Sequence, residues 1–470
     1  MSTTKALLTP GRIGTLEVKN RVIMSPMATG YPSVDGYVDD QLVNYLAARA
    51  KGGVGLVGME FTAVTASGQP PTLPSIYNDS FLPGLTRVAA AIKENGARAM
   101  IQLAHCGRQT YGDPPNGPAQ AASPIPCAGS GTVGREMTEE EIWEVIEDFG
   151  DAAVRAVKAG FEAIEIHHAH GYLIQNFLSP YSNKRTDKWG GSFENRSRLA
   201  REVMRNVRKK VGPDFPILTR ISCAEPTVPG GLTLEDQIEF AKMLEAEGSD
   251  LIDVSVGVYG YQQFLIPPID MPLGLNVEAA REIKKHVNIP VSVVGRINDP
   301  IQAENLLADG GLDFVSIGRG LIADPCFVNK FEEGKLDDIV KCIGCEVADL
   351  LGENGKKVTV LEATSGIATG LDFVRMMVMR NKLAELNVTT ITDAKCTGIG
   401  PNSVSYEKDG WINTISGVET VVIATGVKPY DPLSEWLETE GIEHYVIGDA
   451  KETGYAIDAT QQAAELANKI

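Results

Sequence analysis

One pattern recurs eight times between residue 20 and about residue 335 of this 470-residue chain. Each repeat has a short apolar run, a polar or glycine-rich loop, and an amphipathic stretch with helical periodicity. The runs that we interpret as strands are Val22–Met24, Val54–Glu60, Arg98–His105, Ala163–His168, Ile217–Ser222, Leu251–Val256, Val291–Arg296 and Phe314–Gly318. Runs that are apolar nearly throughout are typical of parallel strands covered by helices. Eight such units favour a (β/α)8 TIM barrel, whose active site lies at the carboxyl ends of the strands.

A doubly wound sheet is the alternative arrangement for strands that alternate with helices. It would place a Gly-x-Gly-x-x-Gly turn after the first strand, where this chain has Ser25-Pro26-Met27-Ala28-Thr29. Helix starts are well marked, because Thr138 and Thr233 each precede an acidic residue, Glu141 and Asp236, by the spacing of an N-terminal capping box. We therefore predict the barrel ahead of the doubly wound sheet.

Composition excludes several kinds of partner. The formal net charge of −18 argues against nucleic acid and against anionic membrane surfaces. No apolar run reaches about 18 residues and the first residues lead into no signal segment, so we expect a cytoplasmic protein without membrane spans. The seven cysteines lack the spacing of a disulfide framework. The length and the hydrophobic content of 43% suit two domains, and homo-oligomer formation is compatible with the sequence.

The fourth predicted strand ends in three histidines and a tyrosine, within Ile164–Leu173. Histidine can donate a hydrogen bond to a carbonyl oxygen near neutral pH, and tyrosine can give up a proton. Such a site is suited to polarising an α,β-unsaturated carbonyl while a cofactor delivers hydride, because no side chain donates hydride. The candidate catalytic residues are His167, His170 and Tyr172. A pair of buried structural histidines and a metal site are the alternatives, although neither histidine has nearby carboxylates or thiolates at metal-ligand spacing.

Residues at the ends of other predicted strands indicate a flavin nucleotide site. Gln102 offers an amide to a flavin pyrimidine ring, and Arg220 could place a positive charge beside the N1–C2 carbonyl. Gly295-Arg296 and Gly318-Arg319-Gly320 close the seventh and eighth strands. Glycine lets backbone N–H groups approach a phosphate, and arginine binds a phosphate through two hydrogen bonds. This part of a barrel commonly binds phosphate.

Several longer motifs cover the same region. They are Asn20-Arg21-Val22 with Pro26-Met27, His167-x-x-His170-Gly171-Tyr172-Leu173, Phe177-Leu178-Ser179-Pro180, Asn183-Lys184-Arg185-Thr186-Asp187 and Gly190-Gly191-Ser192-x-Glu194-Asn195-Arg196. With these motifs, residues 7 to about 335 resemble the flavin barrel of the Old Yellow Enzyme family. The resemblance implies bound FMN, NAD(P)H as electron donor, and reduction of the C=C bond of an unsaturated carbonyl substrate.

The resemblance also implies roles for single residues. Those implied in FMN binding are Pro26, Met27, Ala28, Thr29, Phe61, Gln102, Arg220, Gly295, Arg296, Gly318 and Arg319. His167 and His170 would bind the substrate carbonyl oxygen, and Tyr172 would protonate the α-carbon after hydride reaches the β-carbon. Ala28 stands where relatives often carry a Thr or Cys that tunes the redox potential of the flavin. The neighbouring Thr29 can substitute for that residue.

The rest of the chain resembles the multidomain branch of that family, which includes 2-enoate and 2,4-dienoyl-CoA reductases. In that branch a four-cysteine 4Fe–4S site and FAD and nicotinamide dinucleotide domains follow the barrel. Cys342-Ile343-Gly344-Cys345 matches the first half of the cysteine motif, but Asp349 stands at the third position and no Gly-x-Gly-x-x-Gly follows. Two cysteines cannot hold a cubane cluster, and the dinucleotide phosphates lack their helix N-termini.

We therefore predict three segments. An FMN-binding barrel spans residues 1–335, a linker with a residual iron–sulfur motif spans 336–352, and an incomplete FAD/NAD(P)-type, Rossmann-like α/β domain spans 353–470. Within the last segment, the predicted strands are Gly355–Glu362, Thr420–Gly426 and Tyr445–Ala450.

Three other functions stay open at this point. In the first, electrons pass through FAD and an iron–sulfur cluster. In the second, the barrel oxidises amines, as enzymes similar to trimethylamine dehydrogenase do; those that tether flavin covalently need a cysteine shortly after the first strand, and Met24–Tyr31 contains none. In the third, the chain is a flavin-binding remnant with impaired electron input. Tyr31, Tyr259 and Tyr261 are candidates for lining the substrate pocket, because they follow the first and sixth strands.

Overall fold

The computed structural model describes residues 5–110, 114, 117–260, 262–267, 271–339, 357–362 and 383–419. They belong to two compact units, one within residues 1–358 and 370–388 and the other within 359–369 and 389–470. Cys342, Cys345 and the predicted strands Thr420–Gly426 and Tyr445–Ala450 lie outside the described residues. The domain boundaries given above therefore stay predictions.

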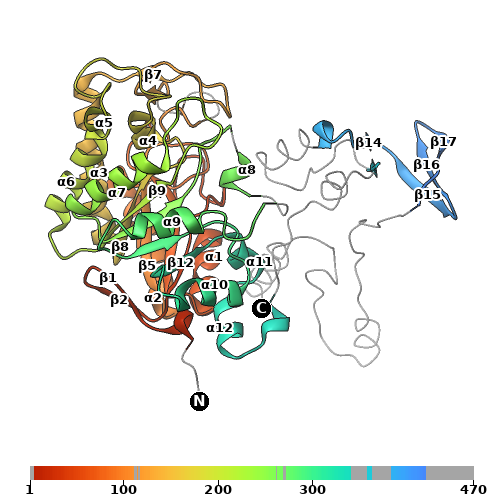
Figure 1. Ribbon diagram of the computed structural model, residues 1–470, viewed down its shortest axis with the longest axis horizontal. Helices are drawn as coiled ribbons and strands as arrows, with labels where there is room; N and C mark the ends of the chain where they lie inside the picture. Colours follow the sequence, from red (N-terminus) through yellow and green to blue (C-terminus); the bar gives the residue numbers. More distant parts are fainter. Residues whose placement is uncertain are drawn as a thin grey trace. The chain divides into compact units, whose positions relative to one another are not determined.

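The first unit contains a closed barrel of eight parallel strands (Figure 1). The strands are β3 (Val22–Met24), β4 (Leu56–Ala63), β5 (Arg98–Ala104), β8 (Ala163–His168), β9 (Ile217–Ser222), β10 (Leu251–Ser255), β11 (Val291–Val293) and β12 (Phe314–Ile317). They neighbour one another in chain order, and β12 pairs with β3 to close the ring. The predicted TIM barrel is confirmed, with shifts of a few residues at some strand ends.

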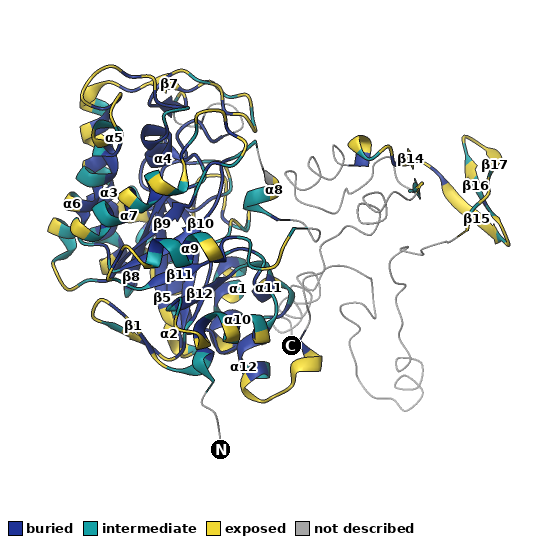
Figure 2. Ribbon diagram, viewed as in Figure 1, coloured by how far each residue is buried: buried dark blue, intermediate teal, exposed yellow. Residues whose placement is uncertain are grey.

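Helices surround the strands, with their inner faces buried and their outer faces exposed (Figure 2). The longer ones are α1 (Asp40–Lys51), α2 (Leu82–Glu94), α3 (Glu139–Ala159), α6 (Arg198–Val211), α7 (Leu234–Ala246), α9 (Val277–Lys284) and α10 (Pro300–Ala308). Shorter helices are α4 (Leu173–Leu178), α5 (Phe193–Arg196), α8 (Gln262–Leu265), α11 (Arg319–Ala323) and α12 (Phe327–Glu332), with 3-10 turns at Ala6–Leu8, Asp79–Phe81 and Leu336–Asp338. Thr138 and Thr233 begin α3 and α7 in complete capping boxes, as predicted.

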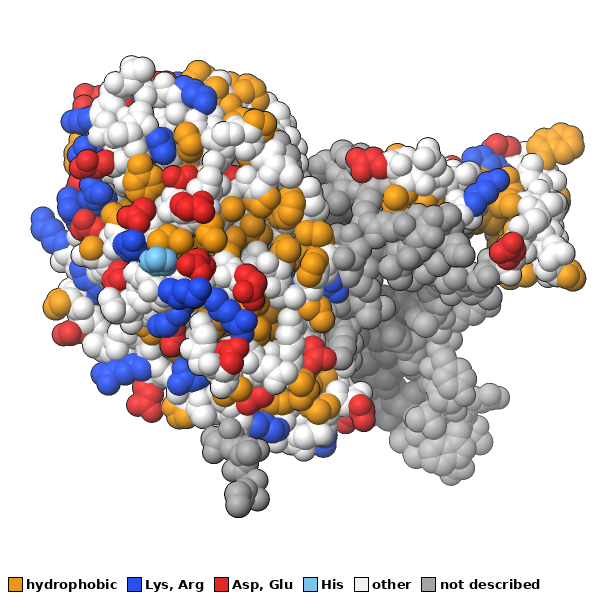
Figure 3. All heavy atoms as spheres, in the orientation of Figure 1, with side chains coloured by type: hydrophobic (Ala, Val, Ile, Leu, Met, Phe, Trp, Pro, Cys, Tyr) orange, Lys and Arg blue, Asp and Glu red, His pale blue; other side chains and the backbone are white. Residues whose placement is uncertain are grey.

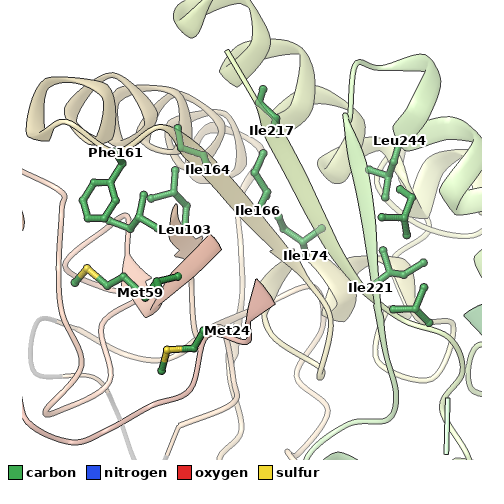
Figure 4. Close-up of a cluster of buried hydrophobic side chains, with 14 of the residues drawn as sticks. Met24, Met59, Leu103, Phe161, Ile164, Ile166, Ile174, Ile217, Ile221 and Leu244 are labelled. Atoms are coloured by element: carbon green, nitrogen blue, oxygen red, sulfur yellow. The ribbon is translucent and has the colours of Figure 1, made fainter. Parts of the chain in front are cut away.

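Strand alternation divides side chains between the helix-facing layer and the barrel interior. Ile164 and Ile166 of β8 join the large hydrophobic cluster between strands and helices, together with Ile217 and Ile221 of β9 (Figure 4). Burial of each such side chain stabilises the fold by about 1.5–3 kcal/mol. Residues between them point the opposite way, into the barrel, because successive side chains of a strand alternate. The strands can therefore carry polar groups inside without weakening the outer core.

The amino ends of the strands are closed by a separate apolar cluster. Its members are Ile13, Val18, Ile23, Leu56, Met100, Ala163, Leu218, Leu251 and Phe314. Ile13 and Val18 come from a hairpin that the sequence analysis did not predict, formed by β1 (Gly11–Ile13) and β2 (Leu16–Val18). Gly14, at φ 53°, lies in its two-residue turn. A second small sheet pairs two strands, β6 (Gln120–Ala121) and β7 (Arg135–Glu136), which follow β5 and precede α3 along the chain.

Charged side chains of both signs are interspersed over the barrel surface (Figure 3). Arg205 of α6, for example, contacts Glu247 at 2.7 Å. Exposed pairs of this kind contribute at most about 1 kcal/mol each, so the core carries most of the stability. In the part of the chain that the structure describes, no helix has the length and apolar character needed to cross a membrane.

The described residues of the second unit form two small sheets. β13 (Thr359–Leu361) pairs in parallel with β14 (Thr389–Ile391), and an antiparallel sheet is formed by β15 (Lys395–Gly400), β16 (Ser403–Lys408) and β17 (Trp411–Ser416). β13 confirms the end of the predicted strand Gly355–Glu362, whereas the antiparallel sheet was not predicted. Asp409 and Gly410 connect β16 and β17 with φ 54° and 79°. An Asp-Gly pair in this conformation is a typical hairpin turn.

Candidate active site

A cavity of about 430 Å³ lies at the carboxyl ends of the barrel strands. Ligand pockets usually measure about 300–1,000 Å³. The predicted site residues that line it are Pro26, Met27, Ala28, Phe61, Gln102, His167, His170, Tyr172, Arg220, Gly295, Arg296, Gly318 and Arg319. Tyr259 also lines the cavity, Thr29 and Tyr31 are not among its lining residues, and Tyr261 lies outside the described residues. Residues that are far apart in the sequence thus meet at one end of the barrel.

The floor of the cavity is a buried polar network. Arg220 Nε donates to Asp253 Oδ2 at 2.8 Å, and another guanidinium nitrogen donates to Ser25 Oγ at 2.8 Å. Gln102 Nε2 donates to Glu165 Oε2 at 2.6 Å, and that oxygen lies 3.8 Å from Arg220 Nε. These contacts fix the orientation of the Gln102 amide and hold the guanidinium in place under the cavity.

The acidic and basic groups of this network shift one another's pKa values. Burial raises the pKa of Glu165, an effect that Arg220 opposes and Asp253 reinforces. Burial works to lower the pKa of Arg220, but the carboxylates of Asp253 and Glu165 outweigh it, so the net shift is upward. Glu165 Oε1 has no hydrogen-bond partner among the residues that the structure describes. The floor therefore presents a permanent cation to whatever binds above it.

His167 and His170 are uncharged hydrogen-bonding groups. The Ala169 N–H donates to His167 Nδ1 at 3.2 Å, so the proton of the neutral ring is on Nε2. Burial, and then the neighbouring His170 and Arg220, holds the pKa of His167 well below its usual value. Burial, and then Arg220, lowers the pKa of His170 to about 3. The ring centroids lie 4.9 Å apart, so two neutral imidazoles stand side by side in the cavity.

The backbone of His170 adopts a left-handed conformation, with φ 64°. That region is uncommon for a residue with a Cβ and persists where the surroundings determine it. Here the His170 N–H donates to Ser222 Oγ at 3.0 Å, and the ring Nε2 lies 2.7 Å from Ser255 Oγ. Val258 also forms a parallel bridge with His170. Three contacts from β9, β10 and the segment after β10 thus hold the second imidazole in place.

Tyr172 stands beside the histidines at the start of α4. Its ring centroid lies 4.9 Å from that of His167 and 5.0 Å from that of Phe61. The side chain is buried, and its hydroxyl lies 3.0 Å from the hydroxyl of Tyr259. Burial, followed by the contact with Tyr259, raises the pKa of Tyr172 well above its usual value. Tyr172 is therefore a protonated phenol at neutral pH.

Two glycine–arginine pairs form the anion-binding end of the cavity. A Cβ on Gly295 would lie 2.8 Å from Asn276 Nδ2, and a Cβ on Gly318 would lie 2.9 Å from Met27 Sδ, so both positions favour glycine. Arg319 donates to the carbonyl of Pro267 at 2.6 Å, and Arg296 donates to that of Met271. Glycine backbone that lines the cavity and two cations fit a phosphate, while the floor of Gln102 and Arg220 fits a flavin ring. The residues present therefore fit FMN.

Several groups of the site were not predicted from the sequence. They are Ser25, Glu60, Glu165, Asp253, Ser255, Asn276 and Ser316. For the members that lie in strands the signal was present, because an acid or a serine within an apolar strand points into the barrel whenever its neighbours point outward. Ser25 and Asn276 lie outside the strands and gave no such signal. The described residues contain no group of three or more His, Cys, Asp or Glu side chains that could hold a metal. Cys342 and Cys345 lie outside those residues, so the residual cluster motif stays a prediction.

Glu60 is one of the missed groups. It lies where the register between β4 and β5 shifts, between Met59 and Phe61. Its carboxyl group binds both the N–H and the hydroxyl of Thr29, the latter at 2.8 Å. Burial raises the pKa of Glu60 to about 8, and the contacts with Thr29 oppose this only in part. The folded chain therefore keeps Glu60 protonated at neutral pH.

We expect Glu60→Gln to change how stability depends on pH. The unfolded chain ionises Glu60 near its ordinary pKa of 4.5, while the folded chain holds the proton up to about pH 8. A group with a raised folded pKa contributes stability that is fully present below the unfolded pKa and is lost as pH rises through the folded pKa. Relative to the variant, the unaltered protein should lose about 1.4 kcal/mol per pH unit between about pH 5 and pH 8. Urea unfolding at several pH values measures the difference, and parallel curves would contradict a protonated Glu60.

Comparison with known proteins agrees with this architecture. The model of the NADH:flavin oxidoreductase / NADH oxidase family matches residues 6–338, and that of pyridine nucleotide-disulphide oxidoreductases matches residues 342–462. The chain is 45% identical over 349 residues to an NADH oxidase of Thermoanaerobacter brockii, which covers 74% of this chain and 54% of that protein. It is 40% identical over 326 residues to an NADPH dehydrogenase of Bacillus cytotoxicus. This match covers 68% of this chain and 90% of that protein.

A solved structure of an old yellow enzyme homologue from Zymomonas mobilis is similar to the barrel. The TM-score is 0.62 at 27% identity, and the match covers 70% of this chain and 93% of that one. Fold and cavity together define an oxidoreductase of the flavin-dependent barrel class. The chain belongs to the NADH:flavin oxidoreductase / NADH oxidase family. It spans about half the length of the first curated relatives that it matches, 54% and 50%.

Proposed function

We propose that the barrel reduces the C=C bond of an α,β-unsaturated carbonyl compound with electrons from NAD(P)H. The observation that carries the proposal is the group formed by two neutral imidazoles and one buried, protonated phenol. His167 lies 4.9 Å, between ring centroids, from both His170 and Tyr172. Hydrogen-bond donors for an oxygen therefore stand next to a proton donor for carbon.

The two histidines bind and polarise the substrate. An N–H donor at a carbonyl oxygen draws electron density away from the β-carbon and stabilises the negative charge that develops on the oxygen. Neutral rings suit this task because they carry no charge that would hold an anionic product. FMN held by Gln102, Arg220 and the two glycine–arginine pairs would supply the hydride chemistry that side chains lack. Tyr172 then gives its proton to the α-carbon.

The surroundings of the site support an enone, an enoate or an enoyl thioester as substrate. Phe264, Leu265 and Ile266 line one side of the cavity and offer apolar contacts to the body of such a molecule. The barrel aligns with 90% of an NADPH dehydrogenase, which favours direct use of a nicotinamide by the barrel. FAD and a 4Fe–4S cluster are not needed for this proposal.

Anaerobic stopped-flow measurements on the FMN-loaded protein test the proposal in two steps. We expect NADH or NADPH to bleach the flavin absorbance, and 2-cyclohexenone or an enoyl thioester to restore it with formation of the saturated product. If neither nicotinamide bleaches the flavin, the proposed electron donor is wrong. If the reduced protein is reoxidised by dioxygen but by none of the unsaturated carbonyl compounds, the proposed reaction is wrong.

A further inference from the structure

The proton donor of the site has a second tyrosine as its neighbour. The hydroxyl groups of Tyr172 and Tyr259 lie 3.0 Å apart, and their ring centroids lie 5.7 Å apart. Tyr172 is 9% exposed, whereas Tyr259 is only partly buried and lines the cavity. Tyr259 therefore joins a buried hydroxyl to a more accessible part of the site.

The position of Tyr259 is fixed by its backbone. Before it, the Gly257 N–H donates to the Ala224 carbonyl at 2.9 Å, and the Gly257 carbonyl accepts from Ser222 Oγ at 2.8 Å. Val258 forms the bridge to His170 described above. The segment that holds His170 is thus anchored directly before Tyr259, and the contact between the two hydroxyl groups follows from there.

Tyr172 needs a source of protons after each turnover. Once its proton has gone to carbon, a phenolate is left in a buried site that disfavours charge. Among the described residues, the other titratable groups that face Tyr172 are His167, Cys106 and Cys127. His167 is already a neutral ring, and the thiols of Cys106 and Cys127 donate to Gly107 O and Gln109 Oε1. The Tyr259 hydroxyl is the group aligned for the transfer.

We propose that Tyr259 is a relay residue that returns a proton from solvent to Tyr172 after each turnover, an inference that rests on the proposed function. The O–H bond of Tyr259 breaks as the O–H bond of Tyr172 forms. The phenolate then on Tyr259 takes a proton from water or buffer, and no other reactant is needed.

Tyr259→Phe tests the relay because it keeps the ring and removes the hydroxyl. Tyr172 starts each experiment protonated, so a single turnover of the reduced, FMN-loaded variant with 2-cyclohexenone should keep its rate. Steady-state turnover should fall on the order of 10-fold, because each later turnover waits for Tyr172 to regain its proton. The first turnover should therefore appear as a burst of one equivalent of product per enzyme, and the solvent isotope effect on kcat should increase. Reduction of the flavin by NADPH should not change. Tyr77→Phe, which loses a hydroxyl that contacts Gln69 Oε1 at 3.5 Å and does not line the cavity, is the matched control and should behave like the unaltered protein.

Two results would overturn the relay. One is an unchanged steady-state rate without a burst; the other is an equal loss in the single turnover, which would place Tyr259 in the chemical step. A measurement without substrate separates this inference from the proposed function. In a difference titration of tyrosinate absorbance, the curve of Tyr172 should change in Tyr259→Phe, because the two hydroxyl groups lie 3.0 Å apart. An unchanged titration would disprove the hydroxyl contact even if no enone were reduced.

Discussion

Tyr172→Phe should slow the reaction with an unsaturated carbonyl compound by about 10²–10⁴-fold, the usual contribution of a positioned proton donor. The ring contacts with Phe61 and His167, at 5.0 and 4.9 Å between centroids, do not involve the hydroxyl. The variant should therefore keep its fold, its FMN and its rate of reduction by NADPH. Anaerobic stopped-flow spectroscopy of the reduced protein with 2-cyclohexenone measures the loss directly, in a single turnover.

A second acceptor provides the control for this experiment. Ferricyanide takes electrons one at a time and needs no proton on carbon, so it should reoxidise Tyr172→Phe and the unaltered protein at equal rates. A loss with both acceptors would mean that the substitution disturbs the flavin site. An unchanged rate with 2-cyclohexenone would mean that another group, or water, protonates the α-carbon.

The sequence was sufficient for the barrel because its signal repeats. Eight apolar runs with helical stretches between them leave few arrangements, and each run reappears as a barrel strand. Gln102, Arg220 and the glycine–arginine pairs could be placed in one site from that fold alone, since the carboxyl ends of barrel strands share one face. The motif around His167 and Tyr172 supplied the chemistry.

The network under the cavity could not be predicted in the same way. Ser25 and Arg220 are 195 residues apart and meet only because the barrel closes. A single serine or acid in a strand gives no sign of its partner, so the pairing of Arg220 with Asp253 needed the register of β9 and β10. The antiparallel sheet of the second unit is a different case. Asp409-Gly410 was an available hairpin signal, but β15 and β17 are mostly exposed, and the three strands lack the apolar runs that identified the barrel strands.

Arg220→Met should destabilise the barrel by about 3–5 kcal/mol at neutral pH, because it leaves two buried carboxyl groups without their cation. Asp253 and Glu165 are each 1% exposed, so water cannot replace the guanidinium. With the cation gone, the pKa of Glu165 should rise further, because Arg220 is the group that opposes the effect of burial, and folding should then require proton uptake. The deficit should accordingly shrink as pH falls and grow as pH rises. Urea unfolding between about pH 5 and pH 8 measures both the size and the slope.

A double variant separates the lost ion pair from a lost packing contact. Arg220→Met combined with Asp253→Asn removes one of the two stranded carboxyl groups, so it should recover part of the stability lost by the single variant, most clearly at the high-pH end. Ser25→Ala removes one hydrogen bond to the same guanidinium and should cost only about 1 kcal/mol. Unfolding curves recorded without FMN and with saturating FMN distinguish the ion pair from a flavin contact of Arg220. If the double variant were as unstable as the single one at every pH, the arginine would act through its packing, and the charge balance under the cavity would not be what holds the floor together.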